Sequence, residues 1–426
     1  MRKKIDARDV QIGMYIAELD RPWLETPFMF QGFELESKEA LNKLQELCRY
    51  VWIETSQGLD YVPPKRGGAH LAMQRMEQLA KEDDEIKQIV RRLAAEVRQP
   101  AGQRKAYPDQ TSFEEELGHA KEIEADTRNA IRESFQEIKR GKPVDLGLAG
   151  KAVGRMVDSI VRNPDALVCL SQLKEVSEYT ALHSIRSCIL ALAFGRHLAL
   201  SKDEMNVLGL GALLHDIGMV KIPEEILEKR GGLTEHEFRT MTRHVPWGLQ
   251  VVSESGGLPP GALDVIAQHH ERGDGGGYPY KRSQTGITPA GYIGAIVDVY
   301  DAVTSDHIYK TGLSAEEALK RMYEWREKDF SAHMIEEFIR CMGIFPIGSL
   351  VELSTGSIGV VITINRARRL KPKVALVLTA AKTRYSARIV TDLLEHTDGQ
   401  GREIKISRVL PAGSHGINPM DHIVQL

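Results

Sequence analysis

The sequence has few cysteines, and none is arranged to hold a metal or to build a disulfide framework. The four cysteines are Cys48, Cys169, Cys188 and Cys341, and no two of them have CxxC spacing. This distribution argues against a zinc site made of thiolates and against a small disulfide-stabilised domain. We therefore expect a reducing compartment, the cytoplasm.

The sequence also lacks a long apolar run. Its most apolar stretch, residues 185–200, is interrupted by Arg186 and Arg196, and no apolar segment follows the basic residues at the start of the chain. A membrane-spanning helix needs about 20 predominantly apolar residues in succession. Neither a membrane span nor a secretory leader is therefore expected.

Neither sign of charge dominates the composition. Lys and Arg number 56 against 59 Asp and Glu, which gives a formal net charge of −3 at pH 7. No global basic charge favours binding to a nucleic acid polymer or to an anionic membrane. The 426 residues exceed one ordinary hydrophobic core, so two or three domains are expected.

Changes in pattern divide the chain into segments. Residues 1–64 predict a small N-terminal α+β module, and residues 65–141 predict charged linker or packing helices. Residues 142–345 are almost wholly helical in pattern, whereas residues 346–426 predict a small, mostly β C-terminal module. The predicted fold class is therefore mainly α, with an all-helical domain between two small modules.

Within the flanking modules the expected elements are short. The predicted β runs are residues 14–17, 50–53, 350–353, 359–362, 374–378 and 404–406. One helix is predicted in the N-terminal module, at residues 38–48. The aromatic residues Trp23, Phe28, Phe30 and Phe33 are expected to fill the core or an interface of the N-terminal module rather than to form a ligand site.

The helices expected in residues 65–141, on either side of a break at residues 99–102, have a narrow apolar stripe. Such a stripe buries little by itself, so it should pack on the next domain or on a second copy of the chain. A homodimer formed through these helices is therefore expected.

The helical segment contains a histidine and an aspartate side by side, His215 and Asp216. Ser201 and Glu204 form a capping box that starts their helix, which we expect to end at Gly218. Burying both polar groups is costly, and a metal is the commonest strong compensator. For the pair alone, a core histidine that hydrogen-bonds to its neighbour is an equally good interpretation.

Other histidines lie on neighbouring predicted helices. His183 is inside an apolar helix, where a lone histidine is more often a satisfied core residue. Thr234 and Glu237 form a second capping box, and we expect the helix that they start to carry His244 a little over two turns along.

His269 and His270 end a helix that begins near Gly261. Adjacent helical residues diverge by about 100°, so both rings can serve one centre only if it holds more than one metal or lies at the helix end.

Asp298 and Asp301 lie one turn apart on a helix that Thr288 and Pro289 start. Both carboxylates could bind metal, or one could anchor a ligand histidine. We favour Asp298 as a ligand and Asp301 as the support of a histidine.

The five histidines and two aspartates offer nitrogen and oxygen ligands and no sulfur. This donor set suits iron, manganese or zinc. Two metals that share Asp216 would supply a nucleophile near neutral pH and stabilise the transition state of phosphoryl transfer.

Taken in order, these residues resemble the signature of the HD-GYP subfamily of HD metallohydrolases. The resemblance covers about residues 145–343 and rests on His183, His215–Asp216, His244, Asp298 and the loop at residues 269–279, HHERGDGGGYP. The N-terminal stretch, with Gly13-Met14-Tyr15, is similar to an uncharacterised domain that often precedes HD-GYP domains.

The resemblance implies a metal-dependent phosphodiesterase with a non-haem iron or manganese centre, whose family substrate is cyclic di-GMP, hydrolysed to linear pGpG and GMP. It implies that the metal ligands are His183, His215, Asp216, His244, His269, His270 and Asp298, with Asp216 bridging. Asp216, His215 and Tyr278 would form the catalytic site. Gly277 and Tyr278 in the loop, together with Lys310 and Lys221, would contact the substrate.

Three positions depart from the family pattern. Tyr179 stands where members with three metals carry a glutamate, so we expect two divalent ions. Met219 replaces a lysine beside the phosphate, with Lys221 two residues on, and His307 replaces an arginine. These losses of positive charge weaken transition-state stabilisation. The alternative is therefore a catalytically weak cyclic di-GMP receptor that signals through its flanking modules, and the fold alone also leaves another phosphoester open.

Overall fold

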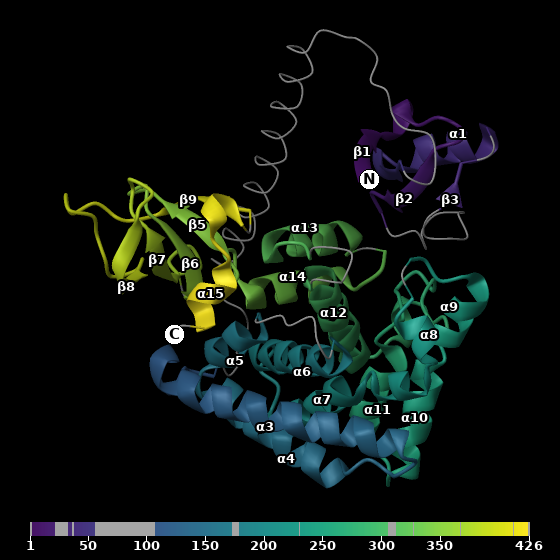
Figure 1. Cartoon of the computed structure of the whole chain (residues 1–426). Helices are drawn as coiled ribbons and strands as arrows, with labels where there is room; N and C mark the ends of the chain where they lie inside the picture. Colours follow the sequence, from purple (N-terminus) through teal and green to yellow (C-terminus); the bar gives the residue numbers. More distant parts are fainter. Residues whose placement is uncertain are drawn as a thin grey trace. The chain divides into compact units, whose positions relative to one another are not determined.

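The computed structural model covers most of the chain (Figure 1). The described residues are 2–21, 33–35, 38–55, 107–172, 179–229, 231–305, 312–326, 328–366, 368–411 and 413–424. The chain forms two compact units, of which one comprises residues 1–85 and 221–243 and the other comprises residues 86–220 and 244–426.

The first unit contains a small antiparallel sheet with strand order β1-β4-β2-β3. Its elements are β1 (Arg2–Asp6), η1 (Ala7–Asp9), β2 (Tyr15–Leu19), β3 (Phe33–Glu34), α1 (Lys38–Leu47), β4 (Tyr50–Glu54), α8 (Glu224–Leu227) and α9 (Glu235–Met241). Alternate strand residues such as Ile5, Ile16 and Ile53 form a core with Leu44 of α1. The predicted α+β character of the N-terminal module is confirmed.

The prediction of this module missed a strand, and one of the four aromatic residues expected in its core or interface lies within the described part of the chain. Strand β1 was not predicted, because its sequence RKKID buries one apolar side chain, that of Ile5. Phe33 packs against the core of the module, whereas Trp23, Phe28 and Phe30 lie outside the described residues.

The second unit is built mainly from helices. They are α3 (Phe113–Lys139), α4 (Leu146–Arg162), α5 (Pro164–Ser171), α6 (Tyr179–His197), α7 (Lys202–Leu214), η3 (Ile217–Lys221, whose last residue belongs to the first unit), α10 (His244–Glu254), α11 (Pro260–Gln268), η4 (Gln284–Gly286), α12 (Pro289–Thr304), α13 (Ala315–Trp325) and α14 (Ala332–Met342). Helices α6, α7, α11 and α12 pack together at the centre, and α3 and α4 run side by side along one flank (Figure 1).

Helix α3 is the second of the two helices expected in residues 65–141. Its apolar residues, among them Phe113, Leu117 and Ile131, join the main hydrophobic core. The helix packs on α4, α5 and α6, as a narrow apolar stripe requires. The first expected helix lies outside the described residues, and the segment boundaries at residues 64, 141 and 345 stay predictions.

The end predicted for the helix with His215 was wrong. Ser201 caps α7 as predicted, but the α-helix ends at Leu214 and a 3-10 turn, η3, follows. A Cβ atom on Gly218 would lie 1.9 Å from the carbonyl oxygen of His244. The chain therefore needs glycine here because η3 lies directly against the start of α10.

The prediction that His244 shares a helix with Thr234 was also wrong. The capping box of Thr234 and Glu237 is present, but α9 ends at Met241 and His244 opens a separate helix, α10. The backbone N–H of Arg243 donates to Thr240, three residues back, so the last turn tightens and α9 does not continue.

The C-terminal residues of the second unit form an antiparallel sheet with strand order β8-β7-β6-β5-β9. Its elements are β5 (Leu350–Leu353), β6 (Ile358–Thr363), β7 (Lys373–Leu378), β8 (Arg384–Asp392) and β9 (Ile406–Leu410), followed by η5 (Ser414–Gly416) and α15 (Pro419–Val424). Three predicted runs correspond to β5, β6 and β7. The run predicted at 404–406 overlaps β9 only at Ile406, and β8 was missed because most of its side chains are exposed.

The C-terminal sheet shares its core with the helices. Leu350 and Val360 belong to the same apolar cluster as Leu167 of α5. The buried carboxylate of Asp165 accepts the backbone N–H of Ile364 at 3.0 Å and pairs with the guanidinium of Arg366.

Among the residues that the structure describes, no helix combines the length and the apolar character needed to cross a bilayer.

Candidate metal centre

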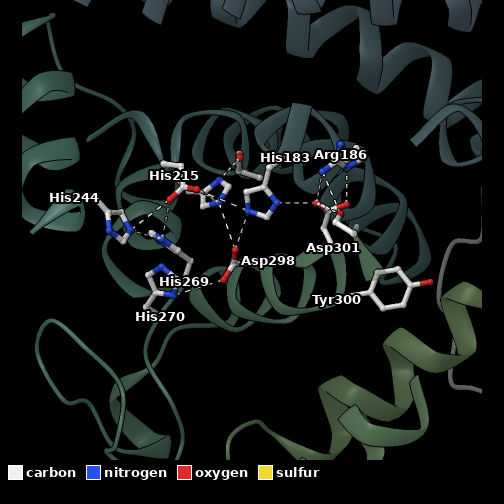
Figure 2. A network of polar contacts seen from close by, with 12 residues as sticks. His183, Arg186, His215, His244, His269, His270, Asp298, Tyr300 and Asp301 are labelled. Atoms are coloured by element: carbon white, nitrogen blue, oxygen red, sulfur yellow. Dashed lines mark hydrogen bonds and ion pairs between the residues drawn. The ribbon is translucent and has the colours of Figure 1, made fainter. Parts of the chain in front are cut away.

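Five helices bring imidazole and carboxylate groups to one buried place (Figure 2). The groups belong to His183 within α6, His215 and Asp216 directly after α7, His244 at the start of α10, His269 and His270 directly after α11, and Asp298 within α12. All are buried except His270, which is half-buried. The structure thus brings together all the residues that the sequence predicted as ligands.

Asp216 lies at the centre of this cluster. Its Oδ1 atom is 3.4 Å from Nε2 of His244 and 3.7 Å from Nε2 of His269. Its Oδ2 atom is 3.6 Å from Nε2 of His215 and 3.8 Å from Nε2 of His183. Each carboxylate oxygen therefore faces a different pair of imidazoles.

Two sets of donor atoms are close enough to hold a cation each. One set is Asp216, His244, His269 and His270, and the other is His183, His215 and Asp216. Asp216 belongs to both, which is the arrangement expected of a carboxylate between two metals.

Asp298 lies across the other side of the cluster. Its Oδ1 atom is 3.0 Å from Nε2 of His183 and 3.7 Å from Nε2 of His215. Its Oδ2 atom is 3.6 Å from Nδ1 of His270. Asp298 therefore contacts histidines of both sets of donors.

Two of the histidines are oriented by the ends of their own helices. Nδ1 of His215 donates to the carbonyl of Ala212 at 2.8 Å, and Nδ1 of His269 donates to the carbonyl of Ile266 at 2.9 Å. A carbonyl can only accept, so Nδ1 carries a proton in both rings, and in the neutral imidazole Nε2 then carries a lone pair that faces Asp216.

Nε2 of His269 lies 3.3 Å from Nε2 of His244, whereas the lone pair of His215 is not satisfied by the part of the chain that the structure describes. Nε2 of His215 and Oδ1 of Asp216 are buried and have no hydrogen-bond partner among the described residues. Buried acceptors that converge without donors are unfavourable unless a cation lies between them. The donor set therefore fits a divalent metal.

Electrostatics keep the carboxylates ionised. Burial alone would raise the pKa of Asp216 and of Asp298, but the surrounding imidazoles outweigh it and hold both pKa values well below the usual range. Burial and the neighbouring His269 lower the pKa of His270 well below its usual value. The two carboxylates and His270 are therefore held in the protonation states that bind metal.

Behind His183 lies a buried ion pair (Figure 2). Asp301 contacts Nδ1 of His183 at 2.7 Å, on the ring edge opposite Asp298. Arg186 donates to both oxygens of Asp301, at 2.7 and 2.9 Å, and to Ser305 at 3.3 Å. Burial lowers the pKa of His183, but the bonds to the two aspartates outweigh burial and raise this pKa to about 10.

Arg186 was not predicted as part of the site. The sequence carries one signal for it, because a charged residue in an apolar helix, one turn after His183, lies on the same helix face. Asp301 was predicted as the support of a ligand histidine, and its contact with Nδ1 of His183 is consistent with that role.

The loop after α11 folds back against the histidines. The ring of Tyr278 lies 4.5 Å from that of His270 and 6.2 Å from that of His244, measured between centroids. A Cβ atom on Gly277 would lie 2.4 Å from the backbone nitrogen of Arg272. Gly277 therefore permits the close return that brings Tyr278 to the cluster.

The other positions that the sequence analysis named are described only in part. Lys310 and His307 lie outside the described residues, and only the backbone of Tyr179 is described. Met219 is half-buried in η3, and Lys221, the last residue of η3, is exposed.

Comparison with known proteins agrees with this arrangement. Sequence profiles match a domain of unknown function (DUF3391) at residues 2–149, an HD domain at residues 166–331 and a KOW domain associated with HD domains at residues 350–399.

Similar proteins include phosphodiesterases of cyclic dinucleotides. A cyclic di-GMP phosphodiesterase of Pseudomonas aeruginosa is 33% identical over 428 residues, which cover 99% of this chain and 95% of that protein. A 3'3'-cGAMP-specific phosphodiesterase of Vibrio cholerae is 29% identical over 45% of this chain and 37% of that protein. The solved structure of an HDG"Y"P protein from Bdellovibrio bacteriovorus covers 79% of this chain and 98% of that chain, with 15% identity and a TM-score of 0.44.

Proposed function

Because this chain belongs to the HD-GYP family of HD-domain phosphodiesterases, we propose that it hydrolyses cyclic di-GMP to linear pGpG, GMP or both. The observation that supports this most directly is the convergence of imidazole nitrogens on Asp216, in two sets that share its carboxylate. Among the described residues, Oδ1 of Asp216 and Nε2 of His215 are buried without a hydrogen-bond partner. Two cations bridged in this way suit the in-line displacement at phosphorus that a phosphodiesterase performs.

We assign one ion to His183, His215 and Asp216 and the other to Asp216, His244, His269 and His270, with Asp298 as a further ligand. Iron or manganese is the proposed metal, and zinc also fits nitrogen and oxygen ligands. When bound, these ions would activate water as the nucleophile and offset negative charge on the phosphate.

The protein itself orients the ligands and the substrate. The carbonyls of Ala212 and Ile266 hold two imidazole rings, and Asp301 holds His183. Burial raises the pKa of Tyr278 well above its usual value, so its phenol keeps a proton that can be donated to the nucleotide. Substrate contacts by Lys310 and Lys221 stay predictions.

Turnover assays test the proposal. Protein purified without oxygen and loaded with Fe(II) or Mn(II) is incubated with cyclic di-GMP or, separately, with 3'3'-cGAMP, and the products are separated by chromatography. We expect linear product from cyclic di-GMP, at a rate that Asp216→Ala lowers by about 1000-fold or more. Asp126→Ala, which removes an exposed carboxylate, is the matched control and should keep the wild-type rate.

Two results would contradict the proposal. One is that no metal supports hydrolysis of cyclic di-GMP, and the other is that Asp216→Ala hydrolyses it as fast as the wild type. Preference for 3'3'-cGAMP would retain the reaction and change the substrate.

A weak enzyme that serves as a cyclic di-GMP receptor is the second candidate. Met219 favours it, because an uncharged side chain stands where the family pattern has a lysine. Loss of such a cation costs about 3 kcal/mol of transition-state stabilisation. Calorimetry should then show tight nucleotide binding with slow turnover, and Met219→Lys should raise kcat by about tenfold or more.

Location in the cytoplasm and a homodimer formed through the helices of residues 65–141 complete the proposal. Both rest on the sequence pattern alone, and sedimentation of the purified chain tests the second.

A further inference from the structure

The loop that follows His270 is closed by a carboxylate for which the proposed reaction has no use. Glu271 is fully buried, with 0% of its surface exposed. Its Oε1 atom accepts the backbone N–H of Tyr280 at 2.7 Å, and its Oε2 atom accepts the backbone N–H of Arg282 at 2.8 Å. The side chain therefore ties the beginning of the loop to the residues just after Tyr278.

Both oxygens of Glu271 are thus engaged within the loop. Neither set of donors that could hold a cation includes Glu271, although its neighbours His269 and His270 belong to one. Hydrogen bonds from backbone N–H groups to a carboxylate are roughly twice as strong as those between neutral groups. Glu271 is therefore suited to hold backbone in place rather than to bind metal.

The other side of Tyr278 is fixed through the backbone. The N–H of Tyr278 donates to the carbonyl of His270 at 3.1 Å, and Gly277 approaches the backbone of Arg272 closely. With Glu271 holding Tyr280 and Arg282, the loop is attached to its own base both before and after Tyr278. The position of the Tyr278 ring beside His270 depends on both attachments.

We propose that Glu271 is a positioning residue that fixes the Tyr278 loop for nucleotide binding, so that affinity for the nucleotide depends on Glu271 and metal binding does not. The inference rests on the proposed function, because that function assigns Tyr278 to the nucleotide.

Glu271→Gln tests the proposal with a side chain of the same size. The amide keeps one acceptor oxygen and turns an NH₂ group toward a backbone N–H, so one hydrogen bond is lost and two donors face each other. We expect KM for cyclic di-GMP, and the Kd of a non-hydrolysable phosphorothioate analogue, to rise by about tenfold or more. kcat should stay within about threefold of the wild type, and bound metal per chain should not change.

Glu115→Gln is the matched control. Glu115 also accepts a backbone N–H, that of Ser112, but it is exposed in a capping box at the start of α3, where glutamine serves as well. This variant should keep the wild-type KM and Kd.

A second variant tests whether Glu271 acts through Tyr278. Tyr278→Ala removes the ring, and Glu271→Gln added to it should weaken binding by less than about threefold more. Full additivity of the two substitutions would contradict an action through Tyr278.

Hydrogen exchange separates failure of this inference from failure of the proposed function. In Glu271→Gln the backbone amides of Tyr280 and Arg282 should exchange about tenfold faster or more, while the amides of α6 and α12 keep their rates. This measurement needs no turnover, so an inactive wild type would contradict the proposed function alone. Unchanged exchange at Tyr280 and Arg282, unchanged KM in an active enzyme, or loss of metal from Glu271→Gln would each overturn the inference.

Discussion

Arg186 is a buried cation whose effect on the candidate centre passes through another residue. Its guanidinium is the counter-ion of Asp301, which in turn contacts His183. Arg186→Met would leave the Asp301 carboxylate in the interior without that counter-ion. We expect a loss of about 3–5 kcal/mol in the free energy of unfolding and a 10–100-fold loss of metal affinity.

Urea unfolding and metal titration measure the two effects. Arg155→Met is the matched control, since it breaks an exposed pair with Asp126 and should change the free energy of unfolding by less than about 0.5 kcal/mol. Wild-type stability and metal affinity in Arg186→Met would show that Asp301 does not depend on its cation.

The candidate ligands could be predicted because their chemistry is visible in residue type and order. Histidine and aspartate are expensive to bury, so several of them on apolar helices point to a shared partner. The roles of Arg186 and Glu271 depend on partners that only the fold supplies. Arg186 meets Asp301, 115 positions away in the chain, and Glu271 is satisfied by backbone groups that have no sequence signature.

At the scale of elements, Gly218 determines how closely η3 approaches α10. A Cβ atom there would lie 1.9 Å from the carbonyl oxygen of His244 and 2.5 Å from the backbone nitrogen of Gly248. Backbone atoms cannot rotate away as a side chain can. Gly218→Ala should therefore lower the free energy of unfolding by about 3 kcal/mol and displace His244.

Gly118→Ala is the control, and we expect it to change the free energy of unfolding in the opposite direction. Gly118 is exposed within α3, and nothing lies within 4 Å of the added Cβ atom. Alanine there should stabilise the chain by about 0.5–1 kcal/mol. Urea unfolding of both variants measures these changes. Equal changes in the free energy of unfolding at Gly218 and Gly118 would contradict the close approach of η3 to α10.

Starts of elements were easier to predict than their ends. The caps at Ser201, Thr234 and Thr288 are local, since each side chain bonds to a backbone N–H within the first turn. The turn η3 that follows α7 lies against α10, a distant segment, and the local pattern around Gly218 does not reveal this contact. Strand β8 was not predicted because its mostly exposed side chains lack the apolar and polar alternation of a half-buried strand.

At the scale of the molecule, the C-terminal sheet and the helices share one apolar cluster and the buried pair of Asp165 and Arg366. Arg366→Met would leave Asp165 with the N–H of Ile364. Because the Arg366 side chain is 36% exposed, we expect a loss of about 1–3 kcal/mol in the free energy of unfolding.

Chemical unfolding checks this expectation against Arg402→Met. Arg402 forms an exposed pair with Asp398 in the same sheet module, so its loss should cost less than about 0.5 kcal/mol. Equal stability of the two variants would show that the junction at Asp165 does not stabilise the unit.

Metal should stabilise one part of the chain and leave another unchanged. A ligand that binds only the folded state adds about 2.7 kcal/mol at 100 times its Kd. On adding Mn(II) to chelator-treated protein, we expect slower amide exchange in α6, α7, α11 and α12. The N-terminal sheet has its own core, so β1 and β4 should exchange as before.

Hydrogen exchange read by mass spectrometry measures both regions in one sample. The Asp216→Ala variant should show no change in either region. Slower exchange throughout the wild-type chain would contradict a centre confined to the helices. Unchanged exchange near the histidines would contradict it as well.

The fold class followed from a change of pattern near residue 346, because apolar spacings of three or four give way to short apolar β runs separated by glycine and polar turns. The joining of helices and sheet into one core did not follow, since contacts such as Asp165 with Ile364 leave no mark on local pattern.

The acceptors that orient His215 and His269 are main-chain carbonyls, at Ala212 and Ile266. Replacing the side chain of Ala212 or Ile266 leaves the main-chain carbonyl in place. Substitutions at these two positions therefore do not remove the hydrogen-bond acceptor of either ring. His183 has no such protection, because its orientation depends on a side chain, Asp301, which depends on another. Saturation mutagenesis should accordingly find tolerance at 212 and 266, within the limits of packing, and intolerance at 186 and 301.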